Sequence, residues 1–419
     1  MRRDLLPFSF LLVSQILTAQ PKFQGDVLPI LQGRCQICHR AGGIGPMALE
    51  TYRQTRPWAK SIEQAVLAKK MPPWFAEAGI GKFSNDASLS SSEIETIVQW
   101  VRAGVPEGNA KDGPEPRVWP SGWSIGKPDA VVTMPRPFAV PKSGEVDYQY
   151  IVVPSGFTED RWVQRVEIRP GLRAAVHHAV VYVREPGSAW LAGVAKGVPI
   201  AVPPQEGFTT SDILFTYTPG NSMDEWPRGV AKLVKAGSDL VFQIHYTAVA
   251  GVGSQLDQTS IAMVFAPERP EERVLTLQLN NDRFVIPPGV KDFRVGAWGT
   301  LPNGARLLSL YPHMHLRGAA FEYRVTLPGG QPSTLLKVNR YDFNWQLTYR
   351  LAQPLTLPAG TRIECAGTFD NTRSNPRNPD PGASVRYGYP SSEEMMIGFF
   401  DVAVPASMDK AAYFVREER

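Results

Sequence analysis

The sequence pattern changes from helical to β-like at about residues 107–120, and this change limits the folds that the chain can adopt. Before that stretch the pattern is helical: a capping box with Ser90 or Ser91 as the cap is followed by Ile94, Ile97, Val98 and Val101 at helical spacing. The stretch itself (EGNAKDGPEPRVWP) is rich in Pro, Gly and charge, as linkers are. Beyond it, alternating segments such as Tyr148–Val153 and Leu240–Tyr246 lie between Pro/Gly turns. The sequence therefore predicts a multidomain protein, all-α at its start and all-β afterwards.

The β-like part also contains a weak internal sequence repeat. Each half contains a pair of histidines, followed by Ala-Gly before an apolar strand, at Ala236-Gly237 and Ala359-Gly360. Two similar antiparallel sandwiches would explain this repeat. The predicted organisation is a signal peptide at 1–19, an all-α domain at 20–106, a linker at 107–122, and two β-sandwiches at 123–270 and 271–419.

The N-terminus has the pattern of an export signal. Met1-Arg2-Arg3 is followed by an apolar stretch, Leu5–Leu17, and by a possible cleavage site after Ala19. That stretch is too short for a bilayer span of about 20 apolar residues. We expect a periplasmic or otherwise extracytoplasmic protein without a membrane span in the mature chain. The formal net charge of +4 and the absence of basic runs argue against a nucleic-acid partner.

A C-x-x-C-H motif lies in the helical region, at Cys35, Cys38 and His39. Two thiols can form thioethers with haem vinyl groups, and the adjacent imidazole can ligate the iron. A thioredoxin-like redox pair would need a βαβ context, and a zinc knuckle would need a second pair of ligands nearby; neither is present. The motif predicts a covalent c-type haem. A methionine is the expected sixth ligand; we favour Met71, with Met47 as the rival.

The other five histidines form an HH pair, a Q-x-H and an H-x-H, all in β-like segments. On a strand, residues two apart point to the same face, so H-x-H is a natural chelate. Adjacent histidines can share a metal only at a bulge or a strand end. Imidazole suits zinc, copper, iron and nickel, so the spacing does not name the metal. The five are His177, His178, His245, His313 and His315.

Residues about 125–419 resemble the copper type II, ascorbate-dependent monooxygenases, the family of peptidylglycine α-hydroxylating monooxygenase and dopamine β-monooxygenase. The resemblance lies in four segments: VHHAVVY at 176–182, VFQIHY at 241–246, HMH at 313–315 and SSEEM at 391–395. It implies two jelly-roll-like sandwiches and two copper ions. One copper would be held by His177, His178 and His245 for electron transfer. The other would be held by His313, His315 and Met395, where oxygen is activated, with Met396 as the rival thioether.

The chain departs from this family at informative positions. Met396 stands where the family has a cysteine, and the usual partner of that cysteine appears as Cys365, which is left unpaired. The residues that grip a peptide carboxylate in the amidating branch correspond here to Tyr311, Ile397 and Phe399. No cation remains among them, so the resemblance does not extend to a peptide C-terminus as substrate.

Together these patterns predict an exported copper monooxygenase that hydroxylates a C–H bond of a small organic molecule with O₂. The haem would supply or relay electrons from a soluble donor, either an ascorbate-like reductant or a redox protein. The alternative is a non-catalytic periplasmic haem/copper electron-transfer or copper-binding protein. A zinc hydrolase is disfavoured because no H-E-x-x-H motif occurs. Two conspicuous polar and aromatic segments, 341–346 and 370–372, are expected to be structural only.

Overall fold

The computed structural model describes residues 20–144, 146–201, 213–248, 255–410 and 413. The predicted signal peptide, residues 1–19, lies outside the described residues. The described chain forms two compact units, each considered by itself below. The small unit contains the chain up to Pro72 together with Ser88–Arg117, and the large unit contains Pro73–Ala87 and the chain from Val118 onwards. Across the described residues, no helix has the length and apolar character that a bilayer crossing requires.

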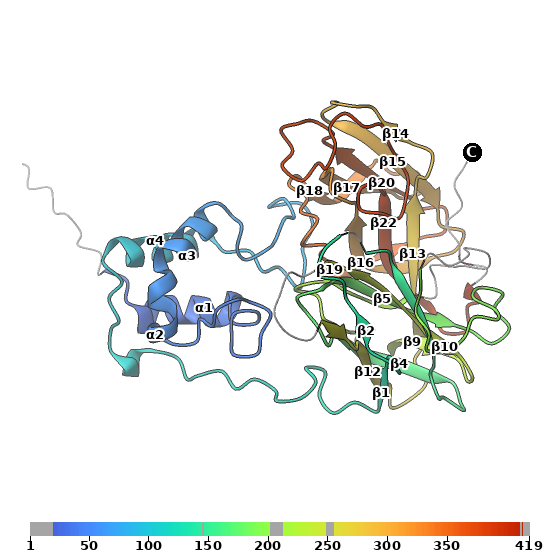
Figure 1. The fold of residues 1–419 in the computed structure, drawn as a ribbon, viewed down its shortest axis with the longest axis horizontal. Helices are drawn as coiled ribbons and strands as arrows, with labels where there is room; N and C mark the ends of the chain where they lie inside the picture. The colour runs from blue at the N-terminus through green and yellow to red at the C-terminus, as the bar shows by residue number, and fades with distance from the viewer. Residues whose placement is uncertain (1–19, 145, 202–212, 249–254, 411–412, 414–419) are drawn as a thin grey trace, which may run out of the picture. The chain divides into compact units, whose positions relative to one another are not determined.

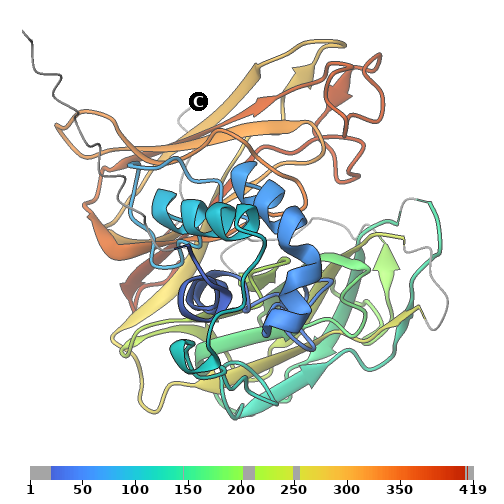
Figure 2. The same ribbon diagram turned by 90° about the vertical axis from the view of Figure 1, so that its left-hand side faces the viewer.

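The small unit is helical (Figure 2), and its described residues contain no strand. Its core is formed by Phe23, Leu31 and Trp100, all fully buried. Ser90 caps the last long helix and forms the predicted capping box with Glu93. The helical elements are η1 (Phe23–Val27), α1 (Leu28–Arg34), α2 (Tyr52–Thr55), η2 (Arg56–Trp58), α3 (Ala59–Leu67), α4 (Ser91–Arg102) and η3 (Ala110–Asp112).

The boundaries of the small unit differ in two places from those expected for the all-α domain. Part of the expected linker folds onto the helices: the Gln32 side chain donates to the carbonyl of Glu115 (2.9 Å), and Arg117 donates to the carbonyl of Gln32 (2.7 Å). Residues 73–87 belong to the large unit, where Ala76 and Phe83 form bridges to Val338 and Leu351. Buried aromatic contacts hold that segment, including Trp74 against Tyr349 at 4.9 Å between ring centroids.

The large unit is built almost entirely from antiparallel strands (Figure 1). Its widest sheet has nine strands, in the order β1 (Ala130–Thr133), β12 (Ser260–Phe265), β4 (Arg161–Arg169), β9 (Val230–Val234), β13 (Glu272–Asn280), β22 (Ile397–Pro405), β16 (Ala305–His313) and β19 (Tyr349–Leu357), with β8 (Met223–Glu225) paired to β4. Among the named strands of the described residues, β9 and β13 form the one parallel pair. It joins the N-terminal and C-terminal halves of the chain within a single sheet.

Smaller sheets complete each half. The N-terminal half has β6 (Ile200–Ala201), β3 (Gln149–Pro154), β10 (Asp239–Tyr246), β5 (Val176–Arg184) and β7 (Ile213–Tyr217), in that order. The C-terminal half has β15 (Phe293–Thr300), β20 (Arg362–Phe369), β17 (Gly318–Thr326) and β18 (Ser333–Val338). Two short pairs join β2 (Phe138–Ala139) to β11 (Leu256–Asp257) and β14 (Val285–Ile286) to β21 (Val385–Arg386).

Each half has its own apolar core beneath the shared sheet. Fully buried Val163, Phe242 and Ile261 lie in the N-terminal core, and Leu307 and Phe321 lie in the C-terminal core. The sequence thus predicted correctly a mostly β chain that follows a helical start. It did not predict that one nine-stranded sheet would run through both halves, because the β9–β13 pairing is not signalled by any local pattern.

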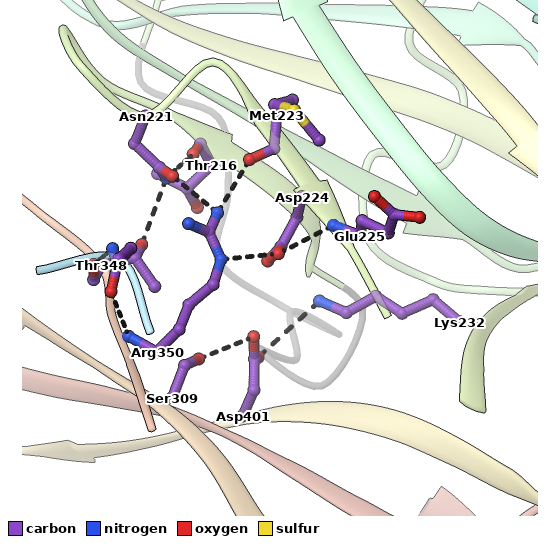
Figure 3. Close-up of polar contacts among 11 residues, drawn as sticks. Thr216, Asn221, Met223, Asp224, Glu225, Lys232, Ser309, Thr348, Arg350 and Asp401 are labelled. Atoms are coloured by element: carbon purple, nitrogen blue, oxygen red, sulfur yellow. Dashed lines mark hydrogen bonds and ion pairs between the residues drawn. The ribbon is translucent and has the colours of Figure 1, made fainter. Parts of the chain in front are cut away.

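A buried polar network crosses the join between the halves (Figure 3). On one side, the Lys232 ammonium donates to Thr276 Oγ1 (2.8 Å) and lies 3.8 Å from Asp401. On the other, Arg350 of β19 forms an ion pair with Asp224 of β8 at 2.8 Å. Buried charges are stable only when they are paired and hydrogen-bonded. This network therefore ties strands of the N-terminal half to strands of the C-terminal half.

Candidate metal centres

Three histidines of the N-terminal half, which we call the first histidine group, lie together on β5 and β10. His178 faces His245 across the ladder, and the register shifts at the next pair, where Tyr246 faces Val176. This irregularity leaves His177 beside its neighbour instead of on the opposite face. The three side chains offer ring nitrogens that all lie within 4.8 Å of one another. The HH pair thus lies at a bulge near a strand end, the setting that the sequence required for a shared metal.

Hydrogen bonds distinguish the two nitrogens of these rings. His177 Nε2 lies 3.0 Å from the Phe343 carbonyl oxygen, while its Nδ1 lies 3.1 Å from Nδ1 of His178. His245 Nε2 lies 3.4 Å from the Ser391 hydroxyl, and its Nδ1 is buried without a hydrogen-bond partner. Because outer partners occupy Nε2 of His177 and His245, their Nδ1 atoms remain available to a ligand.

The second histidine group, His313 and His315 with Met395, belongs to the C-terminal half. His313 ends β16, and the two ring centroids are 5.3 Å apart. Here the outer partners hold Nδ1: His313 Nδ1 lies 2.6 Å from Gln346 Oε1, and His315 Nδ1 lies 3.2 Å from the Glu393 carbonyl. His315 Nε2 is buried without a partner. The second group therefore presents Nε2 atoms where the first presents Nδ1 atoms.

The two adjacent methionines have different surroundings. Met395 lines the same cavity as His178 and His313. Met396 is fully buried in the C-terminal apolar core, with its sulfur 3.8 Å from the Cys365 sulfur. Cys365 is a free thiol, as the sequence predicted. Of the two thioethers, the structure places Met395 with the histidines.

The two groups adjoin each other in the large unit. The rings of His178 and His313 have centroids 5.9 Å apart. The segment 341–346 lies against both groups: Phe343 stacks on His177 at 4.2 Å, and Gln346 bonds to His313. The expectation that this segment is only structural is therefore incomplete. No periodicity or spacing in the sequence signalled it, because these contacts join residues far apart along the chain.

Burial sets the charge state of these histidines. Desolvation lowers the pKa of His177 and His313 to about 4 and that of His245 to about 3. Desolvation, together with the neighbouring imidazoles, also lowers the pKa values of His178 and His315. At neutral pH all five rings are uncharged, which is the form that binds metals.

Glu394 holds the loop that carries the second group. Its carboxylate is fully buried and accepts hydrogen bonds from the backbone amides of His315 (2.9 Å) and Arg317 (2.6 Å). Burial raises the pKa of Glu394 to about 8, against the opposing effect of these bonds. The Arg317 side chain in turn donates to Asn371 Oδ1 (2.9 Å) and to the carbonyl of Ser392 (2.7 Å). Asn371, in the segment 370–372, thus has the structural role that was expected.

The C-x-x-C-H segment of the small unit follows α1. The backbone amide of His39 donates to the carbonyl of Cys35 (2.9 Å), so the motif continues as a helical turn. His39 Nδ1 lies 3.2 Å from the Met47 carbonyl, which orients the ring and leaves Nε2 available. A Cβ at Gly45 would lie 2.6 Å from His39 Nδ1, so this close approach requires glycine. Burial raises the pKa of Cys35 to about 12 and also raises that of Cys38.

The two candidate axial methionines are placed differently. The Met47 carbonyl contacts the Nδ1 side of His39, and its side chain packs on the apolar core of the small unit. Met71 follows α3 with a half-buried side chain. In the described small unit, no hydrogen bond links Met71 to the C-x-x-C-H segment.

Comparisons with known proteins assign no family. No protein-family model matches the sequence, and no curated protein matches it. Among solved structures, the major capsid protein P2 of bacteriophage PM2 is similar, with 11% identity, 67% of this chain and 100% of that chain covered, and a TM-score of 0.30. The infectious bursal disease virus VP2 subviral particle has 10% identity, 70% and 75% coverage, and a TM-score of 0.21. PNGF-II has 10% identity, 66% and 65% coverage, and a TM-score of 0.27. Scores this low carry no conclusion about fold or function.

Proposed function

We propose that this chain is an exported, copper-dependent monooxygenase with a fused c-type cytochrome domain and two jelly-roll-like sandwiches. One observation carries the proposal: five histidines and a methionine from both halves of the large unit gather together, with two buried ring nitrogens left without partners. A buried imidazole nitrogen without a partner is costly, and a bound metal ion removes that cost. The five histidines are otherwise too densely clustered for ordinary core residues.

The donor sets fit copper at both groups. His177, His178 and His245 would hold one ion through three imidazoles, which suits copper. His313, His315 and Met395 would hold the other, and the soft thioether favours Cu(I). Hydrogen bonds to the carbonyls of Phe343 and Glu393 and to Gln346 Oε1 fix the orientation of His177, His315 and His313.

When bound, the copper beside Met395 would activate O₂ for insertion of one oxygen atom into a C–H bond, and the other copper would pass an electron. The balanced reaction is R–H + O₂ + 2 e⁻ + 2 H⁺ → R–OH + H₂O. The protein's own residues set the geometry: Gln346 and Glu394 hold the second group, and the cavity beside Met395 receives the substrate.

The donor atoms of the C-x-x-C-H segment in the small unit suit a haem. Cys35 and Cys38 would form the thioether bonds, and His39 Nε2 would be the fifth ligand because the Met47 carbonyl occupies Nδ1. Met71 remains our proposed sixth ligand, with Met47 as the rival. Such a haem would supply or relay electrons from a soluble donor, in the periplasm or another extracytoplasmic compartment.

The adjacent methionines offer a matched test of the monooxygenase proposal. Copper-loaded protein is given ascorbate, isotope-labelled O₂ and a panel of small organic compounds, and the products are analysed by mass spectrometry. We expect one labelled oxygen atom in a hydroxylated product for wild type and Met396→Leu, and none for Met395→Leu or the His313→Ala/His315→Ala variant. Copper that cycles with ascorbate but labels no product in any protein would instead support a non-catalytic electron-transfer protein.

The haem is tested separately. After denaturing electrophoresis, the protein should retain a haem stain that Cys35→Ala/Cys38→Ala loses, because thioether bonds survive denaturation. Met71→Ala should remove the absorption band of methionine ligation, and Met47→Ala should keep it. Haem that extracts into acidified organic solvent would contradict covalent attachment, and loss of the band in Met47→Ala alone would contradict the axial assignment.

A further inference from the structure

A cavity of about 90 Å³ lies between the two halves of the large unit, beside both histidine groups. His178, His313 and Met395 line it, together with tyrosines from β3, β5, β16 and the segment before Ser391. We propose that this cavity takes a small, neutral substrate with a single aromatic ring and without an ammonium or carboxylate group. The proposal rests on the function proposed above and names the substrate class of that site.

The first argument for this substrate class is the charge of the cavity lining. Among the described residues that line the cavity, none is Asp, Glu, Lys or Arg. Its titratable side chains are tyrosines and the two histidines His178 and His313. No described side chain of the lining could form an ion pair with an ammonium or a carboxylate group, and burying either group without such a partner is costly. The lining therefore selects against both ammonium and carboxylate groups.

Three tyrosine hydroxyls of the lining take part in hydrogen bonds. The Tyr182 hydroxyl donates to Gln243 Oε1 (3.3 Å), and the Gln243 amide donates to the Tyr150 hydroxyl (2.5 Å). The Tyr311 hydroxyl donates to Gln346 Oε1 (3.3 Å). With these three hydroxyls held, we expect the rings of Tyr150, Tyr182 and Tyr311 to be the surfaces that contact a ligand. Such surfaces bind an aromatic ring by offset or edge-to-face contact.

The size of the cavity limits the ligand further. An apolar cavity of roughly 150 Å³ holds one benzene molecule, and this cavity, at about 90 Å³, is smaller. A single ring is therefore the largest aromatic system that we expect it to take, and only once the lining adjusts. Tyr311 and Phe399 stack at 5.7 Å on one wall. Tyr311 lies two residues before His313 on the same strand, so it meets the substrate close to the reacting end.

Three compounds of nearly equal shape test this inference: 2-phenylethanol is neutral, 2-phenylethylamine is cationic and phenylacetate is anionic. Binding to copper-loaded protein is measured by calorimetry without reductant, so that turnover is not required. We expect saturable binding of 2-phenylethanol at least about tenfold tighter than that of either ion, equivalent to about 1.4 kcal/mol. In Tyr311→Arg the order should change, with phenylacetate bound more tightly than 2-phenylethanol.

The outcomes separate the two proposals. Tighter binding of either ion to the wild type, equal binding of all three, or no saturable binding would overturn the substrate class. Since the wild-type series alone decides this, a Tyr311→Arg variant that fails to fold leaves the inference testable. Selective binding of 2-phenylethanol without labelled product from any compound would retain the inference and count against the monooxygenase. A labelled product from 2-phenylethylamine in preference to 2-phenylethanol would support the monooxygenase and overturn the substrate class.

Discussion

Gln346 determines which nitrogen of His313 is free. Its Oε1 lies 2.6 Å from His313 Nδ1 in a fully buried setting, so the ring carries its proton on Nδ1 and directs Nε2 outwards. The backbone carbonyl of Gln346 accepts a hydrogen bond from the Thr218 hydroxyl (2.8 Å). A single side chain outside the histidine pattern thus sets the geometry of the second histidine group.

We expect Gln346→Leu to weaken copper binding at the second group about 10- to 100-fold, because His313 loses the partner that orients it. Competition with a Cu(I) chelator measures this affinity. The control is Tyr311→Phe, which removes only the longer bond to the same oxygen and should leave the affinity within about threefold. Equal affinities in wild type and Gln346→Leu would show that the hydrogen bond does not position His313.

At the scale of elements, the histidine strands were predictable and the loops that complete the site were not. H-x-H and HH indicated chelation from local geometry alone, and the β5–β10 irregularity supplies the bulge that HH needed. Phe343 and Gln346 could not be found in this way, because their contacts with His177 and His313 span 166 and 33 residues. Their positions depend on how the two halves pack, which no local pattern encodes.

The loop that ends in Met395 depends on one buried carboxylate. Glu394→Ala should lower the free energy of unfolding by about 2 to 5 kcal/mol, because the buried amides of His315 and Arg317 lose their acceptor. Thermal denaturation of the metal-free protein measures the change. The neighbouring Glu393→Ala removes a more exposed acceptor, so less than about 1 kcal/mol is expected. Equal losses in the two variants would contradict the role given to Glu394.

At the scale of the whole molecule, the nine-stranded sheet makes one body of the two halves of the large unit. The ion pair of Asp224 with Arg350 joins strands from both halves (Figure 3). Its side chains are 9% and 26% exposed, so solvent screens it less than an ordinary surface pair. This join connects the half that carries the first histidine group to the half that carries the second.

A double-mutant cycle tests this join. For Asp224→Asn and Arg350→Met we expect a coupling of about 1 to 3 kcal/mol in the free energy of unfolding. The control is the pair Arg228 and Glu268, which are 83% and 78% exposed and 3.6 Å apart; its coupling should be near zero. A coupling at Asp224 and Arg350 no larger than that of the control would mean that the pair does not stabilise the join.

The covalent path between the two units bears on electron supply. The chain passes from one unit to the other at three points, after Pro72, after Ala87 and after Arg117. Such short tethers keep a carrier at roughly millimolar effective concentration. If the haem feeds the copper centres, stopped-flow mixing of reduced protein with O₂ and substrate should oxidise the haem several-fold faster in wild type than in His313→Ala/His315→Ala. Equal rates would mean that the haem serves another acceptor.

The most direct test of the central claim is the copper content of the purified, copper-loaded protein, measured by mass spectrometry with zinc as the competing metal. The account predicts two copper ions per chain for wild type and for Met396→Leu. It predicts one for His245→Ala, which loses the first group, and one for His313→Ala/His315→Ala, which loses the second. A single copper in wild type, or zinc retained in place of copper, would contradict it.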